Sequence, residues 1–432
     1  MIGNKMLRIY LIIYNALFVA GMPLVILVFL FSSKYRKEFF YKLSERFACY
    51  KPVSKKSKKT TIWVHCASLG EVRAVEPILD ALQEKYYIVL TTITKSGREH
   101  AQKLQKADFV ALLPLDIYPI MNKAFSIINP SMLVLVETEL WVTMLYSAAS
   151  KNVKIITING RMSAKSFKAY KKVKFFWRSF VSLISTVIAR SKDDADRFEF
   201  LTDGKSDIVV SGNIKYDRDF TLDSKREDFM LKKEDFVFTA GSTREGEEEF
   251  IAEAYNKISS DFKNIRFFLA PRHFPRIEEV VNILKNKGIK YSLFSSGDFS
   301  ANFILIDVFG KLQNIYSVSD VCYVGGSLVN KGGQNPIEPA AYGKSVLFGK
   351  NMNNFITEAE SLIREGGAFF VEDSNDLVAK VKEFILNRRL LEDAGQRALK
   401  TVRSQKGAVF FTVEKIRKML VPFSFDGSQR DE

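Results

Sequence analysis

The chain has 432 residues, too many for one ordinary domain, and its 47% hydrophobic and 26% charged residues are typical of a folded protein rather than a disordered one. The formal charge of +15 indicates an anionic partner. Because no DNA- or RNA-binding motif occurs, an anionic membrane surface or an acidic glycolipid is favoured over nucleic acid. Three histidines exclude a histidine-rich metal site, and three cysteines in no metal spacing fit a reducing compartment.

The N-terminal segment contains a long run without charge. Residues 9–31 are almost wholly apolar, and 23 residues of helix reach roughly 34 Å, enough to cross the hydrocarbon core of a bilayer. Lys34, Arg36 and Lys37 follow closely, which places that side in the cytoplasm by the positive-inside rule. Residues 1–50 are therefore expected to form a membrane-spanning anchor, with a kinked or monotopic anchor in one leaflet as the alternative. The basic residues within 51–59 form either a solvated loop or a contact for anionic lipid headgroups.

Short apolar runs alternate with helix-length amphipathic segments over the rest of the chain. The runs are residues 62–66, 87–93, 110–115, 132–136, 154–158, 187–189 and 208–210, and then 236–239, 266–269, 303–306, 321–324, 346–348 and 369–371. This alternation is typical of βα units around a parallel sheet. We expect an N-terminal domain at 51–218, a linker at 219–234, a C-terminal domain with terminal helices at 235–424 and a tail at 425–432. The predicted fold class is α/β, with two doubly wound Rossmann-like domains that face a cleft behind the anchor.

Three charged residues in the first half are candidates for a site. Glu71 opens a helix after a predicted strand, so it either stabilises the helix start or acts as a general base facing the cleft. Glu137 directly follows another predicted strand, where a buried carboxylate needs either a cationic partner, such as Arg161 or Lys215, or a function. Lys215, at the end of the first domain, is either a surface lysine or a contact for phosphate.

A glycine-rich stretch at residues 325–343 dominates the second half. It follows a predicted strand, and a helix is expected to begin near Pro336, so backbone N–H groups and the helix dipole there suit a phosphate or a nucleotide. Glu338, in the first turn, either caps this helix or holds a ribose hydroxyl pair. Arg272 offers a planar donor fork, and residues 309–311 form either a nucleotide-binding turn or an ordinary one.

Two further patterns carry weaker signals. Residues 241–247 resemble a phosphate-cradling turn but lack a full P-loop pattern. Asp194 with Asp196, and Asp217 with Asp219, match the D-x-D spacing of some metal sites. We interpret both pairs as solvated or ion-paired acids, because such short patterns often arise by chance, and no metal site is expected.

A series of motifs follows one order along nearly the whole chain, from the apolar segment to about Phe411. They are Glu45-Arg46-Phe47, 68–71, Thr91-Thr92-Ile93-Thr94 with Gly97, Leu113-Pro114-Leu115-Asp116, 137–141, Arg161-Met162-Ser163, 212–217, 241–243, Pro271-Arg272-His273, 325–327, 332–339 and Asn354-Phe355. In this order they resemble the 3-deoxy-D-manno-octulosonic acid (Kdo) transferase family of lipopolysaccharide synthesis.

The resemblance implies a GT-B glycosyltransferase that transfers Kdo from CMP-Kdo to a lipid A precursor of the lipid IVA type, with inversion. It implies that Glu71 is the general base and that Glu137 and Lys215 assist the transition state. The residues implied to hold the CMP part of the donor are Pro271, Arg272, Phe309, Gly310, Lys311, Asn335, Pro336, Ile337 and Glu338. It implies no cofactor, and it places the catalytic domains on the cytoplasmic side of a bacterial inner membrane, whose anionic lipids are a further expected partner.

The chain departs from the family pattern at three places. Gln334 stands where the family has His, Lys311 where it has Glu, and Val142-Thr143 where it has Pro-Asn. The three implied catalytic residues are all present, so an active enzyme is expected. Two other functions fit the residues: a GT-B transferase that uses a UDP-sugar, and a membrane-attached protein that binds a nucleotide or an anionic lipid without catalysis.

Overall fold

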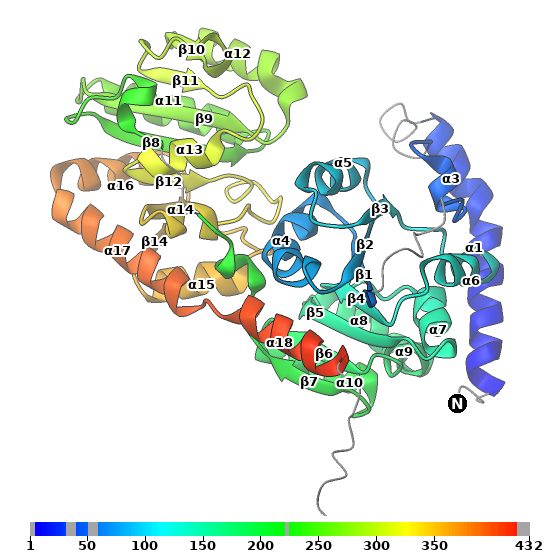
Figure 1. The fold of residues 1–432 in the computed structure, drawn as a ribbon. Helices are drawn as coiled ribbons and strands as arrows, with labels where there is room; N and C mark the ends of the chain where they lie inside the picture. Colours follow the sequence, from blue (N-terminus) through cyan, green and yellow to red (C-terminus); the bar gives the residue numbers. More distant parts are fainter. Residues whose placement is uncertain (1–4, 32–39, 51–58, 221–223, 421–432) are drawn as a thin grey trace, which may run out of the picture. The chain divides into compact units, whose positions relative to one another are not determined.

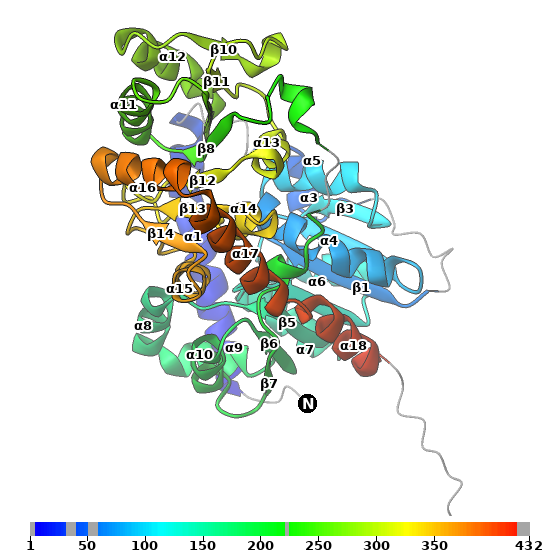
Figure 2. The same ribbon diagram turned by 90° about the vertical axis from the view of Figure 1, so that its left-hand side faces the viewer.

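The computed structural model describes residues 5–31, 40–50, 59–220 and 224–420. The chain divides into two compact units, Met1–Arg218 together with Lys406–Glu432, and Asp219–Gln405. Each unit is built on one seven-stranded sheet, and all the paired strands are parallel (Figures 1 and 2). The expected α/β class with two parallel-sheet domains is therefore confirmed.

The first unit contains a doubly wound sheet in the order β3-β2-β1-β4-β5-β6-β7. Its strands are β1 (Thr61–Cys66), β2 (Tyr87–Thr92), β3 (Phe109–Leu112), β4 (Met132–Val136), β5 (Lys154–Gly160), β6 (Thr186–Ala189) and β7 (Asp207–Val210). All seven apolar runs of the first half thus form strands, since strands covered on both faces read as continuous apolar runs. The winding reverses between β1 and β4, where sheets of this kind bind ligands at the carboxyl ends of their strands.

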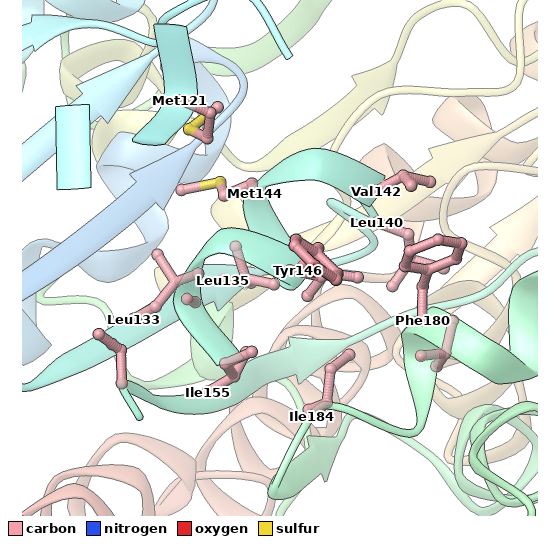
Figure 3. Packing of buried hydrophobic residues seen from close by; sticks show 14 of the residues in the cluster. Met121, Leu133, Leu135, Leu140, Val142, Met144, Tyr146, Ile155, Phe180 and Ile184 are labelled. Carbon is pink, nitrogen blue, oxygen red and sulfur yellow. The ribbon is translucent and has the colours of Figure 1, made fainter. Parts of the chain in front are cut away.

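Helices cover both faces of this sheet. They are α1 (Lys5–Phe31), α3 (Leu43–Arg46), α4 (Leu69–Gln83), α5 (Lys95–Leu104), α6 (Tyr118–Ile128), α7 (Val142–Ser150), α8 (Ala164–Lys172), α9 (Lys174–Val181), α10 (Lys192–Thr202) and α18 (Ala408–Leu420), with the 3-10 turn η1 (Ile214–Asp217). Successive residues of β4 face opposite clusters: Leu133 and Leu135 pack with α7 and α9, whereas Val134 packs with α4. Figure 3 shows the first cluster, in which Tyr146 of α7 and Phe180 of α9 contribute large buried rings.

The second unit contains a sheet in the order β10-β11-β9-β8-β12-β13-β14. Its strands are β8 (Phe236–Thr243), β9 (Ile265–Pro271), β10 (Tyr291–Leu293), β11 (Phe303–Leu305), β12 (Val321–Val324), β13 (Ser345–Phe348) and β14 (Ala368–Phe370). Its helical elements are η2 (Arg226–Phe229), α11 (Glu247–Ser259), η3 (Phe274–Arg276), α12 (Ile277–Asn286), η4 (Phe294–Ser296), α13 (Leu312–Val318), α14 (Ile337–Ala341), α15 (Ile356–Arg364), α16 (Ser374–Leu386) and α17 (Arg388–Ser404). Six strands were expected; β10 was not, because three half-buried edge residues give too short a pattern.

The last helix, α18, packs on the first unit, whereas the expected 235–424 domain assigned it to the second. Its Val413 and Ile416 join the core cluster around β1 and α4. The Asp217 carboxylate accepts hydrogen bonds from the N–H groups of Gly407 and Val409, at 2.6 Å each, and thereby caps the start of α18. An amphipathic pattern predicts a helix but not the sheet that it covers. The other domain boundaries stay predictions.

The helix expected in the N-terminal segment is present as α1. Its part Lys5–Leu27 is long and apolar enough to cross a membrane, with a mean hydropathy of 2.1. Leu7 and Leu11 are nevertheless buried in the core cluster that also contains residues of α7 and α9. One face of the helix is therefore part of the first unit.

Candidate active site

Two neighbouring strands at the winding reversal of the first sheet each lead into a carboxylate. Glu71 is the third residue of α4, which follows β1, and Glu137 directly follows β4. The two strands are hydrogen-bonded to each other, with Val64 opposite Val134. The structure thus brings the two predicted carboxylates to the same edge of the sheet, the edge at which doubly wound folds bind ligands.

The Glu71 carboxylate is held by the turn that opens α4. Ser68 is the N-cap residue, and its hydroxyl accepts a hydrogen bond from Glu71 N–H at 3.4 Å and donates one to Glu71 Oε1 at 2.9 Å. Ala67 N–H donates to Glu71 Oε2 at 2.7 Å. These bonds fix the orientation of the carboxylate, and each of its oxygens keeps a lone pair that can accept a further proton.

The environment of Glu71 moves its titration towards neutral pH. Burial raises the pKa of Glu71 to about 7, the negative charge of Glu137 adds to the shift, and the hydrogen bonds from Ala67 and Ser68 act in the opposite direction. A group that titrates near the working pH is suited to general acid–base catalysis. The two alternatives considered for Glu71 are therefore compatible, because the same carboxylate caps a helix and can accept a proton.

Glu137 and Lys215 form an ion pair. Lys215 Nζ lies 2.8 Å from Glu137 Oε1, and the two side chains are 21% and 18% exposed. Burial alone would raise the pKa of Glu137, but the Lys215 ammonium, followed by the Arg161 and Arg190 guanidinium groups, outweighs burial and holds this pKa below its usual value. One of the two partners considered for Glu137 is thus found, and the carboxylate is ionised at neutral pH.

The backbone at Glu137 adopts a left-handed conformation, with φ of 61°. For a residue other than glycine this costs about 1–3 kcal/mol and is seen chiefly at functional sites. The two carboxylates of this motif serve different partners: Glu139 Oε2 accepts a hydrogen bond from the Trp141 indole at 2.7 Å and lies 3.7 Å from His65 Nε2. At this strained turn the Glu137 carboxylate therefore pairs with Lys215, whereas the Glu139 carboxylate holds the Trp141 ring in place.

In the second unit, arginines stand at the carboxyl ends of β8 and β9. Arg272 is exposed directly after Pro271, the last residue of β9, and its N–H donates to Thr243 O at 2.9 Å. Burial, and then the positive charge of Arg272, lower the pKa of Arg244, whose guanidinium hydrogen-bonds His273 Nε2. Two guanidinium groups that repel each other are stabilised by a bound anion. The predicted Pro271 and Arg272 and the unpredicted Arg244 therefore form a candidate phosphate site.

The predicted nucleotide-binding turn at residues 309–311 joins β11 to α13 and is exposed. The Phe309 side chain is 63% exposed, and its ring packs edge-on against Phe274 with 6.2 Å between centroids. Lys311 is the N-cap residue of α13 and its side chain makes no capping hydrogen bond. An exposed aromatic ring beside turn backbone suits contact with a nucleotide base.

The glycine-rich stretch after β12 is held in place by one buried carboxylate, Glu247. Its oxygens accept hydrogen bonds from the N–H groups of residues 326–328 at 2.6–3.0 Å and from the Tyr323 hydroxyl at 2.7 Å. A Cβ on Gly325 would lie 2.5 Å from Ser242 O, so only glycine allows this close approach to β8. The loop is therefore rigidly tied to the carboxyl end of the central strand.

The helix expected near Pro336 is α14, which has only five residues with Pro336 at its N-cap. Asn335 Oδ1 accepts a hydrogen bond from Ile337 N–H at 3.2 Å, and Asn335 Nδ2 donates to Glu338 Oε1 at 3.5 Å. So short a helix sums few peptide dipoles. The expected contribution of its dipole to phosphate binding is therefore small, and side chains and turn backbone have to supply the contacts.

Neither Arg244 nor Glu247 was singled out by sequence reasoning. The resemblance of 241–247 to a phosphate-cradling turn pointed to this segment only weakly. The sequence also shows an acidic run at the start of α11, and the structure buries Glu247 and Glu248 fully while Glu249 is exposed. Acidic residues are common in a first helical turn, so the run alone did not distinguish buried from solvated carboxylates.

The residues at the three departures from the family pattern differ in their contacts and burial. Thr143 N–H donates to Asp116 Oδ2 at 3.0 Å and its hydroxyl donates to Asp116 O at 2.8 Å, so this residue fixes the start of α7. Gln334 is half-buried, and its backbone N–H donates to Gly325 O at 3.0 Å. Lys311 is exposed, in a turn whose backbone is the proposed contact.

The acidic pairs with metal-like spacing have structural partners. Asp194 accepts a hydrogen bond from Met162 N–H at 2.8 Å, Asp196 pairs with Lys192 at 2.6 Å, and Asp217 caps α18. Asp194 also lies 3.8 Å from the guanidinium groups of Arg190 and Arg197, so the interpretation of the first pair as ion-paired acids is confirmed, whereas Asp217 is a helix cap rather than a solvated acid. In the part of the chain that the structure describes, no group of three or more His, Cys, Asp or Glu side chains is placed to hold a metal ion.

The sequence is similar to Kdo transferases. A family model described as "3-Deoxy-D-manno-octulosonic-acid transferase (kdotransferase)" matches residues 41–218. A protein of Aquifex aeolicus named 3-deoxy-D-manno-octulosonic acid transferase is 31% identical over 336 residues, 77% of this chain and 88% of that protein. A protein of the same name from Haemophilus influenzae is 29% identical over 428 residues, 95% of this chain and 98% of that protein.

Two further comparisons are narrower in what they show. A bifunctional glycosyltransferase/methyltransferase of Fusobacterium nucleatum is 33% identical over 344 residues, but the chain spans only 52% of its length. The crystal structure of a UDP-GlcNAc 2-epimerase from Neisseria meningitidis matches with a TM-score of 0.59 at 12% identity, over 83% of this chain and 100% of that chain. This second likeness shows the fold alone, which is of the GT-B type.

Proposed function

We propose that this chain, which belongs to the 3-deoxy-D-manno-octulosonic acid (Kdo) transferase family, transfers Kdo from CMP-Kdo to a lipid A precursor of the lipid IVA type. The family assignment rests on the 31% identity that covers 88% of the Aquifex aeolicus relative. Family membership makes the chain a glycosyltransferase of lipopolysaccharide biosynthesis. The acceptor, the inversion of configuration and the residue roles are the proposed part.

The observation that carries the mechanism is the Glu71 carboxyl group beside the Glu137–Lys215 pair, at the edge of the sheet where ligands bind. As the acceptor hydroxyl attacks the anomeric carbon of Kdo, its proton passes to the Glu71 carboxylate, whose pKa of about 7 suits this transfer. The new C–O bond forms on the face opposite to the leaving group, so the configuration inverts. The bond from the same carbon to the phosphate oxygen breaks, and CMP leaves with both bonding electrons.

The Glu137–Lys215 pair is proposed to stabilise charge in the transition state. The anomeric carbon becomes cationic as CMP departs, and an ionised Glu137 carboxylate favours that charge. The Lys215 ammonium, held 2.8 Å from Glu137, favours the negative charge that accumulates on the leaving phosphate. Because the pair is preorganised by its own hydrogen bond, neither group has to reorient during the reaction.

The CMP part of the donor is proposed to bind in the second unit. Arg272, directly after Pro271, and Arg244 beside it offer cationic contacts for the single phosphate. The exposed turn 309–311 suits the base. Glu338, oriented by Asn335 at 3.5 Å, suits the ribose hydroxyl pair. One phosphate carries less charge than a diphosphate, so the proposal needs no metal.

The proposed location is the cytoplasmic side of the bacterial inner membrane, where CMP-Kdo and a lipid acceptor meet. Support comes from the apolar helix α1 and from the net charge of +15, which attracts anionic lipids as well as a phosphorylated acceptor.

Turnover tests the proposed reaction. Purified full-length protein is incubated with CMP-Kdo and a tetra-acylated lipid A precursor, with CMP-Kdo alone and a UDP-sugar donor as controls. Release of CMP together with a glycolipid heavier by whole Kdo units is the expected result, and mass spectrometry also counts the units added. Absence of product with this pair, or product only with the UDP-sugar, contradicts the proposal.

A further inference from the structure

The anchor helix α1 has two faces of opposite burial. The face that touches the first unit contains Leu7 and Leu11, which are 5% and 7% exposed, and the half-buried Tyr10, Tyr14 and Asn15. The face turned away from the unit is apolar and open: Ile9, Ile12, Ile13, Leu17, Val19, Leu24 and Leu27 are between 40% and 69% exposed. A helix whose one side is docked on a folded domain cannot be surrounded by lipid on that side.

The docking is specific, because polar groups of α1 complete the domain. The Tyr14 hydroxyl donates to the buried Asp116 carboxylate at 2.9 Å. Asn15 Nδ2 donates to the Thr143 hydroxyl at 3.2 Å, and Asn15 Oδ1 accepts from Tyr118 N–H at 2.7 Å, which caps the start of α6. Tyr14 and Asn15, which lie within the apolar stretch, thus have hydrogen-bond partners in the first unit.

Aromatic packing adds to these bonds. Phe176 of α9 packs against the rings of Tyr10 and Tyr14, with 5.8 and 6.4 Å between centroids. Figure 1 shows α1 running along the first unit beside α7 and α6, in agreement with these contacts. Residues 7–15 of α1 are therefore built into the first unit.

This docking leaves too little free helix to cross a bilayer. From Ala16 to Phe31 the helix has 16 residues, which at 1.5 Å each reach about 24 Å, short of the roughly 30 Å hydrocarbon core. A crossing that used the whole helix would carry the docked α9, with Lys174 and Arg178, towards the hydrocarbon. Placing such charges at the centre of the hydrocarbon is strongly unfavourable.

The charges that flank α1 give no preference for a crossing either. Lys5 and Arg8 stand at its N-terminal end, and Lys34, Arg36 and Lys37 follow its C-terminal end in the sequence. Positive charge favours the cytoplasmic side, so cations at both ends favour placing both ends on that side. The same cations match the anionic headgroups of a membrane surface.

We propose that α1 is a monotopic anchor: it stays docked on the first unit and lies in the plane of the membrane, with its apolar face among the acyl chains and both ends on the side of the catalytic units. Of the two anchors considered from the sequence, one that spans the membrane and one that enters a single leaflet, this proposal selects the second. The contact with lipid holds the carboxyl edge of the first sheet at a fixed position relative to the bilayer, since Tyr14 and Asn15 of α1 bond directly to that unit. The inference concerns topology and does not depend on the sugar that is transferred.

Thiol labelling of the two ends tests the topology. Cys66 and Cys322 are buried and Cys49 is exposed, so Cys49→Ser gives a background without a reactive thiol, and native Cys49 reports the side of the first unit. Lys5→Cys and Phe31→Cys, each in that background, place one thiol near each exposed end of α1. The full chain is expressed in a bacterial inner membrane, and a membrane-impermeant maleimide is added to inside-out and right-side-out vesicles.

All three thiols are expected to react in the same vesicles, the inside-out ones, and to stay unlabelled in the others. Labelling of Lys5→Cys from the side opposite to Cys49 would show a crossing helix and overturn the proposal. Labelling of Lys5→Cys in neither preparation, but in detergent, would place that end inside the bilayer and would overturn it as well. Thermal unfolding of each variant in detergent, compared with the wild type, confirms that the chain is folded.

Discussion

The ammonium group of Lys215 lies 2.8 Å from Oε1 of Glu137, and this joins the turn η1, which follows β7, to the end of β4 at the carboxyl edge of the first sheet. The pair links residues 78 positions apart in the sequence. It also sets the charge next to Glu71, because the ionised Glu137 raises the pKa of that carboxyl group. The charge balance of the proposed site therefore depends on all three residues together.

The first prediction concerns this pair. Lys215→Met and Glu137→Gln are each expected to lower kcat/KM for Kdo transfer by about 10²-fold, the size of effect seen when one preorganised charge contact to a transition state is removed. The double variant is expected to lose little more than either single one, because each group is held in its working position by the ion pair with the other, so removing one displaces both. Lys192→Met removes an ion pair between exposed side chains and serves as the control, with unchanged kcat/KM expected. Losses that multiply in the double variant would contradict the coupling.

The second prediction concerns pH. Glu71 accepts a proton only when ionised, so kcat/KM is expected to rise with pH to a plateau, with its midpoint near the pKa of about 7. In Glu137→Gln a negative neighbour is lost, the pKa of Glu71 falls, and the midpoint is expected to move to lower pH. The measurement is kcat/KM for both proteins between pH 5 and 9. A midpoint that stays in place or moves upward would contradict the proposed electrostatic link.

How much of this site was predictable depends on the range of the interactions. The ends of β1 and β4 follow from local patterns, since an apolar run followed by small residues and a carboxylate marks a strand and a helix start. Ser68 with Glu71 is a local pattern too, and the structure has both side chains in the helix-starting turn. The sequence did not indicate whether Glu137 pairs with Lys215 or with Arg161. Both are cations, and only the folded structure determines which of them lies next to the carboxylate.

Other features depend on contacts between distant segments, which one sequence does not encode locally. Nothing in the segment of Glu247 indicates that loop N–H groups some 80 positions later bind its oxygens. The amphipathic pattern of α18 gives no sign that Asp217 caps it on the first unit. In α1, the face that docks on the first unit could not be recognised from the sequence, because residues buried in a domain and residues that face lipid are equally apolar.

A third prediction concerns the glycine-rich loop. Glu247→Gln replaces one acceptor oxygen by an NH₂ group that faces backbone N–H donors, so the free energy of unfolding is expected to fall by about 3 kcal/mol or more and the affinity for CMP to fall with it. Glu249→Gln, on the exposed side of the same helical turn, is the matched control and is expected to change stability by less than about 0.5 kcal/mol. Chemical denaturation and CMP titration measure both. Equal effects of the two substitutions would show that the buried carboxylate does not hold the loop.

A fourth prediction tests the docking of α1. Asn15→Leu keeps the helix apolar but removes the cap on α6 and the bond to Thr143, so the stability of the detergent-solubilised protein is expected to fall by about 1–2 kcal/mol. Ala16→Leu, on an exposed position next to it, is expected to leave stability unchanged. Thermal unfolding in detergent distinguishes them. If Asn15→Leu is as stable as the control, the polar contacts of α1 do not contribute to the fold.

The most direct test of the central claim is the turnover of Glu71→Gln with CMP-Kdo and the tetra-acylated lipid A precursor, beside Glu84→Gln at the exposed far end of the same helix. Glutamine can still accept the hydrogen bond from Ala67 N–H, so the helix start is expected to persist, but it cannot take the proton of the acceptor. The account predicts that kcat/KM falls by about 10²–10⁴-fold in Glu71→Gln, with loss of the midpoint near pH 7, while Glu84→Gln behaves as the wild type. A Glu71→Gln protein that keeps wild-type turnover and the same pH profile would contradict Glu71 as the general base.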